Sequence, residues 1–254
     1  MSDVVEQAET AADRPVAATR PGRRASSIVQ GAAIALGLVL MVGGFAVLAV
    51  DYRPYRIPSA SMMPTLQVGD TVLARKAGEG SVGRGDVVVF RDQAWGGELM
   101  VKRVVAVGGD TVSYGDGNKL SVNGRAIDEP YVDGRSLPSE GFSVEVPAGR
   151  LFLLGDNRLA SLDSRMHLEV ASGTVPAADV VARVEATILP FDGIGTLARA
   201  VPFGVLGGPG PSRPGPLEPA AYTTAAGAAL IVLTSAVGGV AGLVRRVGGR
   251  RSAE

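Results

Sequence analysis

A long, uncharged apolar run over residues 28–50 constrains this 254-residue chain more than any other feature. The run contains 23 residues and no charge, and as a helix it would extend about 35 Å, enough to cross a bilayer. A cleaved export signal is the alternative, because Arg20, Arg23 and Arg24 precede the run. The run is longer than the apolar part of a typical export signal. We therefore expect a retained anchor with these arginines on the cytoplasmic side.

A second apolar run, over residues 221–244, is rich in alanine, glycine and valine. Four arginines follow it: Arg245, Arg246, Arg250 and Arg251. The rule that basic flanks stay inside places this tail in the cytoplasm, so that both termini are cytoplasmic and the middle of the chain is outside. Because alanine and glycine make the run only mildly hydrophobic, a buried core helix is the alternative. We expect a multi-pass protein of the plasma membrane.

Composition excludes several kinds of chemistry. The 25 basic and 25 acidic residues cancel, so no overall field favours nucleic acid as a partner. The chain has no cysteine and only one histidine, His167, which rules out a disulfide framework, a thiol nucleophile and a zinc site of the usual kind. Catalysis would have to use Ser, Thr, Lys, Asp or Glu, and we expect no metal and no organic cofactor.

The remaining sequence divides by composition into tails, a domain and a linker. Residues 1–27 are polar and lack apolar periodicity, which predicts a disordered cytoplasmic tail. Residues 51–201 are expected to form a catalytic domain outside the membrane. Residues 202–220 are dominated by proline and glycine and are predicted to be a linker back to the membrane. Residues 245–254 form the basic cytoplasmic tail.

Short β-type runs dominate the middle of the chain. The expected strands are Thr71–Arg75, Asp86–Phe90, Leu99–Val107, Thr111–Tyr114, Lys119–Val122, Phe142–Val146, Arg150–Leu154 and Val180–Ile188. Asn123-Gly124 is a strong hairpin signal between Leu120-Ser121-Val122 and Arg125-Ala126-Ile127. The prediction is an all-β domain of curved antiparallel sheets, or a partly closed barrel, flanked by two transmembrane helices.

Lys102 is one of only three lysines and lies in a strongly apolar strand. Strand alternation places it on the same face as Met100, Val104 and Ala106. If this face points to the core, burial disfavours the ammonium and lowers its pKa, which arginine does not permit. A neutral lysine amine can take a proton from a serine hydroxyl. The alternative is a lysine whose stem packs on the sheet while its amine stays in water.

A serine-rich turn follows the first apolar run within about a dozen residues. Pro58 and Pro64 bracket the sequence Ser59-Ala60-Ser61-Met62-Met63 and restrict its backbone on both sides. Two hydroxyls separated by one small residue suit a nucleophile and a donor to a developing oxyanion. An ordinary serine-containing loop is the alternative.

Four segments together resemble the conserved boxes of bacterial type I signal peptidases. Residues 58–66, Pro-Ser-Ala-Ser-Met-Met-Pro-Thr-Leu, resemble the nucleophile box of that family. The further boxes follow in the family's order: Gly85–Phe90, then Lys102-Arg103 with Gly109-Asp110, then Gly155–Arg158 leading to Ser161, Asp163, Ser164 and Arg165. The resemblance covers about residues 28–190, and four ordered boxes make it highly specific.

The resemblance implies a role for each matching residue. Ser61 would be the nucleophile and Lys102 the general base, with the Ser59 hydroxyl and the Ser61 N–H donating to the oxyanion. Ser161 would hydrogen-bond to Lys102 and orient it. In addition, Asp163 and Arg165 would form a supporting ion pair, and Arg103 and Asp156 would belong to the scaffold.

The chain departs from the family pattern at several positions. Leu159 and Ala160 replace the frequent Asp and Asn beside Ser161, which puts the support of that loop in question. Ala60 replaces a frequent glycine between the two serines, and Ala106 and Gly108 stand where Gly and Pro are common. His167 follows the last box instead of occupying the lysine position, so we expect it to be a loop or surface residue.

The expected function is that of a membrane-bound serine endopeptidase. It would remove N-terminal signal peptides from exported preproteins after an Ala-x-Ala-like site. Expected partners are those signal peptides and membrane lipid, and the secretion translocon is a further candidate. An inactive membrane-tethered scaffold, a self-cleaving Ser-Lys regulator like those of the SOS response, and a processor specialised for one secreted partner are the alternatives.

Overall fold

The computed structural model describes residues 22–78, 80–115, 119–132, 141–198 and 201–251. The chain divides into two compact units. The helical unit comprises the chain up to Val42 and from Thr223 onward, and the main unit comprises Gly43–Tyr222. The two long helices are α1 (Gly22–Asp51) and α2 (Leu217–Arg251). The last residues of α1 and the first residues of α2 belong to the main unit.

Both helices are longer than the apolar runs that predicted them. Ser26–Asp51 and Leu217–Gly242 are long and apolar enough to cross a membrane by length and composition. Within the helical unit, a Cβ added at Gly37 of α1 would lie 2.9 Å from the Gly227 carbonyl oxygen of α2. The reverse test at Gly227 gives 2.5 Å to the Gly37 carbonyl oxygen. The two helices therefore make backbone contact through these glycines, as small residues permit in membrane helix pairs.

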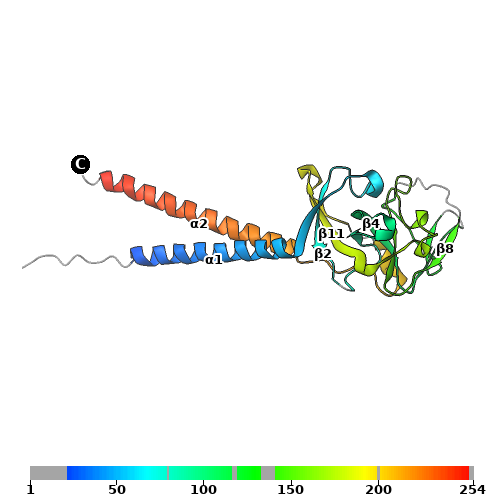
Figure 1. The fold of residues 1–254 in the computed structure, drawn as a ribbon. Helices are drawn as coiled ribbons and strands as arrows, with labels where there is room; N and C mark the ends of the chain where they lie inside the picture. The colour runs from blue at the N-terminus through cyan, green and yellow to red at the C-terminus, as the bar shows by residue number, and fades with distance from the viewer. Residues whose placement is uncertain (1–21, 79, 116–118, 133–140, 199–200, 252–254) are drawn as a thin grey trace, which may run out of the picture. The chain divides into compact units, whose positions relative to one another are not determined.

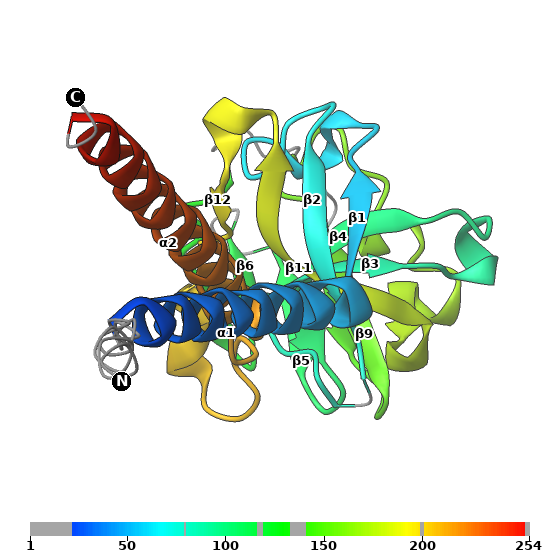
Figure 2. The ribbon, with the colours of Figure 1, turned by 90° about the vertical axis from the view of Figure 1, so that its left-hand side faces the viewer.

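Two antiparallel sheets form the main unit (Figures 1 and 2). The larger sheet has the order β1-β2-β11-β3-β4-β9-β10, and β12 pairs with β11. Its strands are β1 (Tyr52–Arg56), β2 (Thr71–Lys76), β3 (Val87–Phe90), β4 (Met100–Val107), β9 (Arg150–Leu154), β10 (Thr174–Pro176), β11 (Val180–Leu189) and β12 (Gly195–Thr196). The smaller sheet has the order β7-β6-β5-β8, formed by β5 (Thr111–Tyr114), β6 (Leu120–Val122), β7 (Arg125–Ala126) and β8 (Phe142–Glu145).

The predicted antiparallel sheets are confirmed, but the expectation of a partly closed barrel is wrong. The larger sheet is open, with β1 and β10 at its two ends. Both end strands contain proline, Pro54 in β1 and Pro176 in β10. Because proline has no N–H to donate to a further strand, it is suited to a sheet edge and opposes closure.

The hairpin predicted at Asn123-Gly124 is present. Val122 pairs with Arg125 across the turn. Asn123 has φ of 54° and Gly124 has φ of 74°, so both turn residues adopt the left-handed conformation of a type I′ turn.

Strand β4 runs through the centre of the larger sheet, between β3 and β9. Lys102 and Arg103 are adjacent in this strand, and both are buried. Met100 and Val104 pack in one apolar cluster, whereas Ala106 belongs to another together with Phe152. The register with β9 shifts between Val104 and Ala106, which ends the simple alternation expected for the whole strand.

The segment predicted as a Pro/Gly linker is packed against the main unit. Phe203 is 1% exposed and joins the core cluster of the smaller sheet, so the domain continues past residue 201. The Arg84 guanidinium donates to the carbonyl oxygens of Gly207 and Pro209. The Ser212 N–H and hydroxyl bond to the Asp86 carboxylate. Proline-rich composition predicted a linker without helix here, but the segment contains most of a 3-10 helix, Val201–Leu206, and the first residues of α2, and these contacts were not predicted.

Candidate active site

The serine-rich turn lies between β1 and β2 as a short 3-10 helix, Ala60–Met62. Met62 is fully buried in an apolar cluster with Ile57, which fixes the turn from both sides of the serine. Asn157 holds the turn from the opposite loop. Its backbone N–H donates to the Ser61 carbonyl oxygen at 3.1 Å, and its side-chain amide donates to the Ala60 carbonyl oxygen at 3.1 Å.

Lys102 reaches this turn from the central strand. Its Nζ lies 3.1 Å from the Ser61 Oγ and 3.1 Å from the Val101 carbonyl oxygen. Lys102 is 4% exposed and Ser61 is 8% exposed, so the pair is shielded from water. Burial lowers the pKa of Lys102 below its ordinary value of 10.5, although the charges of Asp163 and Asp156 act in the opposite direction. A buried amine with a lowered pKa at hydrogen-bond distance from a hydroxyl can accept that hydroxyl's proton.

Ser59 is the second hydroxyl at the nucleophile. Its Oγ donates to the Ser61 Oγ at 3.3 Å. Unlike Ser61, it is exposed, so an incoming substrate can reach it. The Ser59 hydroxyl is therefore free of a covering residue and can donate to a group that approaches the Ser61 Oγ.

Ser161 is buried beside the site, but it does not bond to Lys102 in this structure. Its Oγ has no hydrogen-bond partner among the residues that the structure describes. A Cβ added at Gly155 would lie 2.2 Å from the Ser161 Oγ and 2.5 Å from the Ser61 carbonyl oxygen. Glycine is therefore the only residue type at position 155 that lets these two serines approach each other. The role implied for Ser161 stays a prediction.

Asp163 and Arg165 form an ion pair next to Ser161. The Arg165 guanidinium donates to both Asp163 carboxylate oxygens at 2.9 Å. Asp163 also accepts from the Gly155 N–H at 3.0 Å, and Arg165 donates to the Arg158 carbonyl oxygen at 2.9 Å. These bonds fix the loop that carries Ser161 without the Asp and Asn that Leu159 and Ala160 replace.

Arg103 and Asp156 connect strand β4 to the same loop. The Arg103 guanidinium donates to Asp156 through two bonds, of 2.8 Å and 2.6 Å, and to the Gly85 carbonyl oxygen at 2.8 Å. Thr65 donates to Asp156 at 2.5 Å and thereby ties the serine turn to this ion pair. All four sequence boxes therefore meet around one buried arginine.

Several supporting residues were not identified from the sequence. Glu129 accepts from the Arg158 guanidinium and from the Tyr131 hydroxyl. Tyr131 in turn stacks on Arg103, with its ring centroid 4.1 Å from the guanidinium carbon. Neither lies in a recognisable motif, so only tertiary contact reveals them. Asn157 could have been identified, because it lies inside the last box.

His167 lies outside the Ser61–Lys102 pair. Its ring stacks on Trp95 with centroids 4.1 Å apart and an interplanar angle of 10°. Its Nδ1 lies 2.9 Å from the Asp163 carbonyl oxygen. The residue is half-buried in a loop contact and is not placed to activate Ser61.

Comparisons with known proteins point to one family. The family model described as signal peptidase, peptidase S26, matches residues 27–189. Signal peptidase I of Mycobacterium tuberculosis (strain ATCC 25618 / H37Rv) is 33% identical over 244 residues, covering 74% of this chain and 82% of that protein. Signal peptidase I U of Bacillus subtilis (strain 168) is 34% identical, covering 58% of this chain and 81% of that protein.

A solved structure is also similar in sequence over part of the chain. The crystal structure of a signal peptidase I from Enterococcus faecalis V583 is 30% identical and covers 39% of this chain and 93% of that chain, with a TM-score of 0.33. The family match, which covers more than half of the present sequence, carries the assignment. The chain therefore belongs to peptidase family S26, the signal peptidases, as an enzyme of the bacterial type I group.

Proposed function

We propose that this enzyme is a membrane-bound Ser/Lys endopeptidase that releases exported preproteins from their signal peptides after an Ala-x-Ala-like site. The observation that carries the proposal is the buried contact of 3.1 Å between Lys102 Nζ and Ser61 Oγ. Two helices of membrane-spanning length support membrane attachment. Lipid is then a direct partner, and the secretion translocon is the proposed source of substrates.

In the proposed reaction, neutral Lys102 takes the proton of the Ser61 hydroxyl as its Oγ attacks the substrate carbonyl carbon. The oxyanion that forms is stabilised by the Ser59 hydroxyl and the Ser61 N–H. Losing one such donor costs roughly 10²–10³ in rate in other serine peptidases. The lysine then gives its proton to the leaving amine, which breaks the peptide bond and leaves an acyl group on Ser61. Lys102, neutral again, then takes a proton from the water that hydrolyses this ester.

Substitutions at the two reacting side chains test the mechanism. Detergent-solubilised variants Ser61→Ala and Lys102→Arg are expected to lose cleavage of a preprotein, followed by mass spectrometry of the products. The arginine variant is the sharper of the two, because its side chain keeps the charge but cannot act as a base. Lys119→Arg provides the matched control on an exposed lysine and is expected to keep full activity.

Two results would refute the proposal. Substantial cleavage by Lys102→Arg would show that Lys102 is not the base. Cleavage by the wild-type enzyme only at positions without small residues would show that preproteins with an Ala-x-Ala-like site are not its substrates.

A further inference from the structure

Glu185 of strand β11 forms a hydrogen-bonded junction. Its side chain is only 9% exposed. The carboxylate accepts from the Tyr52 hydroxyl at 2.8 Å, from the Gly215 N–H at 3.1 Å and from the Arg183 guanidinium. One carboxylate on a central strand therefore binds two segments that are far apart in the sequence.

Both segments adjoin the ends of apolar helices. Tyr52 directly follows Asp51, the last residue of α1, and Gly215 lies two residues before Leu217, the first residue of α2. The Leu217 backbone also lies near the Tyr52 hydroxyl and acts to lower its pKa. Burial, and then the bond to Glu185, raise the pKa of Tyr52, so the hydroxyl keeps the proton that it donates. The end of α1 and the start of α2 are thus both attached to the sheet at Glu185.

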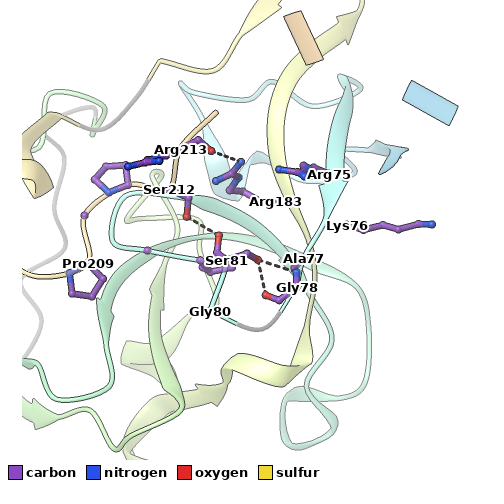
Figure 3. Close-up of a pocket in the computed structure, with 14 residues that line it drawn as sticks. Arg75, Lys76, Ala77, Gly78, Gly80, Ser81, Arg183, Pro209, Ser212 and Arg213 are labelled. Carbon is purple, nitrogen blue, oxygen red and sulfur yellow. Dashed lines mark hydrogen bonds between the residues drawn. The ribbon is translucent and has the colours of Figure 1, made fainter. Parts of the chain in front are cut away.

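The junction has little room to move. A Cβ added at Gly215 would lie 2.4 Å from the Tyr52 hydroxyl and 2.6 Å from the Glu185 carboxylate. Arg183 also donates to the Arg213 carbonyl oxygen at 2.9 Å, and Ser212 bonds to the Ser81 carbonyl oxygen at 2.6 Å, as Figure 3 shows. The chain before α2 is therefore fixed at successive residues.

The same junction is connected to both reacting side chains through paired strands. Tyr52 begins β1, which pairs with β2 along its whole length and leads directly to the turn that carries Ser61. Strand β11 pairs with β3, in which Val88 is the partner of Lys102. The separation between the helix ends and the Ser61–Lys102 pair is therefore set by hydrogen-bonded strands and not by flexible loops.

We propose that Glu185 is a positioning residue that holds the Ser61–Lys102 pair at a fixed height from the helix ends at Asp51 and Leu217, and so selects which peptide bond of an inserted substrate is cut. This inference rests on the proposed function. An extended chain advances about 3.3 Å per residue, so even a small change in height would present a neighbouring bond. A soluble peptide has no membrane reference, and its cleavage does not depend on this height.

The test compares two substrates with the full-length enzyme in lipid vesicles. One is a preprotein whose apolar run is followed by overlapping small-residue sites, so that cuts at neighbouring bonds can be separated by mass spectrometry. The other is a short soluble peptide containing one site. The variants are Glu185→Gln, which keeps the shape of the side chain, Tyr52→Phe and Gly215→Ala. Thermal unfolding of each variant is measured in the same vesicles.

The proposal predicts that the variants alter the cleavage of the preprotein but not that of the soluble peptide. Glu185→Gln and Tyr52→Phe are expected to change the ratio of neighbouring preprotein products by about tenfold, as expected for weakening or loss of a buried charge-assisted hydrogen bond. Gly215→Ala is expected to change this ratio as well, because its added Cβ displaces the same groups. Cleavage of the soluble peptide is expected to stay within about twofold of wild type in kcat/KM, since the Ser61–Lys102 contact is unchanged. Gly204→Ala, where an added Cβ meets nothing within 4 Å, and exposed Glu145→Gln are the matched controls and should leave both substrates unaffected.

Two outcomes would overturn the inference while leaving the proposed function intact. One is an unchanged product ratio in all three junction variants. The other is a parallel loss on both substrates, which is the result for a purely structural residue. Failure of the wild-type enzyme to cut either substrate in a Ser61-dependent way would instead overturn the proposed function itself.

Discussion

Opposing electrostatic effects act on the pKa of Lys102. Burial lowers its pKa and is the largest influence, while the carboxylates of Asp163 and Asp156 raise it. Both carboxylates are largely neutralised by their own arginine partners, Arg165 and Arg103. Burial therefore prevails, and the net shift is downward. Activity that needs the neutral amine should be lost as the pH falls through this lowered pKa.

Gly155 permits the close approach of the two buried serines, and it provides the first test at the residue scale. Gly155→Ala is expected to displace Ser61 or Ser161 and to lower kcat/KM by about 10²-fold, the effect of misplacing a catalytic group by about 1 Å. The measurement is peptide cleavage together with thermal unfolding. Gly204→Ala is the control, because its added Cβ meets nothing within 4 Å. Equal activity of the two variants would contradict this account.

At the residue scale, sequence patterns identified the two side chains that meet in the candidate site but not all of those that hold them. The approach of Ser61 and Lys102 was predicted because both lie in boxes with a recognisable pattern. The bond between Ser161 and Lys102 was also expected, and it is absent here. Glu129 and Tyr131 could not be predicted, because their contacts with Arg158 and Arg103 arise only from tertiary packing.

At the scale of elements, the predictable strands were those with a clear apolar pattern. The predicted runs Thr111–Tyr114 and Arg150–Leu154 match the observed strands at both ends. Strands β10 and β12 have three and two residues, too short to show alternation, and were not predicted. Strand β1 was missed for another reason: Pro54 and its charged neighbours obscure the pattern.

The contact between α1 and α2 gives a prediction at the element scale. Gly227→Val should force the helices apart, because even a Cβ at this position would lie 2.5 Å from the Gly37 carbonyl oxygen. We expect a loss of roughly 1–3 kcal/mol in the stability of the helix pair, measured by thermal unfolding in detergent. Gly239→Val is the matched control, since an added Cβ there meets nothing within 4 Å. Unfolding of both variants at the same temperature would show that the glycine contact contributes nothing.

For the molecule as a whole, the predicted topology has a direct test that uses the absence of cysteine. Cysteine is introduced at exposed Ser143 of β8 or at Ser252 near the C-terminus. A membrane-impermeant maleimide added to intact cells should label Ser143→Cys but not Ser252→Cys, which should react only after permeabilisation. Labelling of both in intact cells would place the C-terminus outside and contradict a second complete crossing.

The whole molecule also shows where composition ceases to predict structure. Residues 202–220 have the proline and glycine content of a spacer, yet Phe203 is buried and Ser212 binds Asp86. Composition reports how easily a segment forms helices or strands. It does not report which distant charges that segment will contact, and here those contacts attach the start of α2 to the sheet.

The central claim is that Lys102 is an uncharged base at the pH of catalysis, and titration of its amine tests this most directly. The chain has only three lysines, so lysine labelled with ¹³C at Cε gives few NMR signals, and the variants Lys76→Arg and Lys119→Arg assign them. The account predicts that the Lys102 signal titrates well below the ordinary lysine pKa of 10.5, and that kcat/KM rises with pH over the same range. A Lys102 pKa at or above 10.5 in the active enzyme would contradict it.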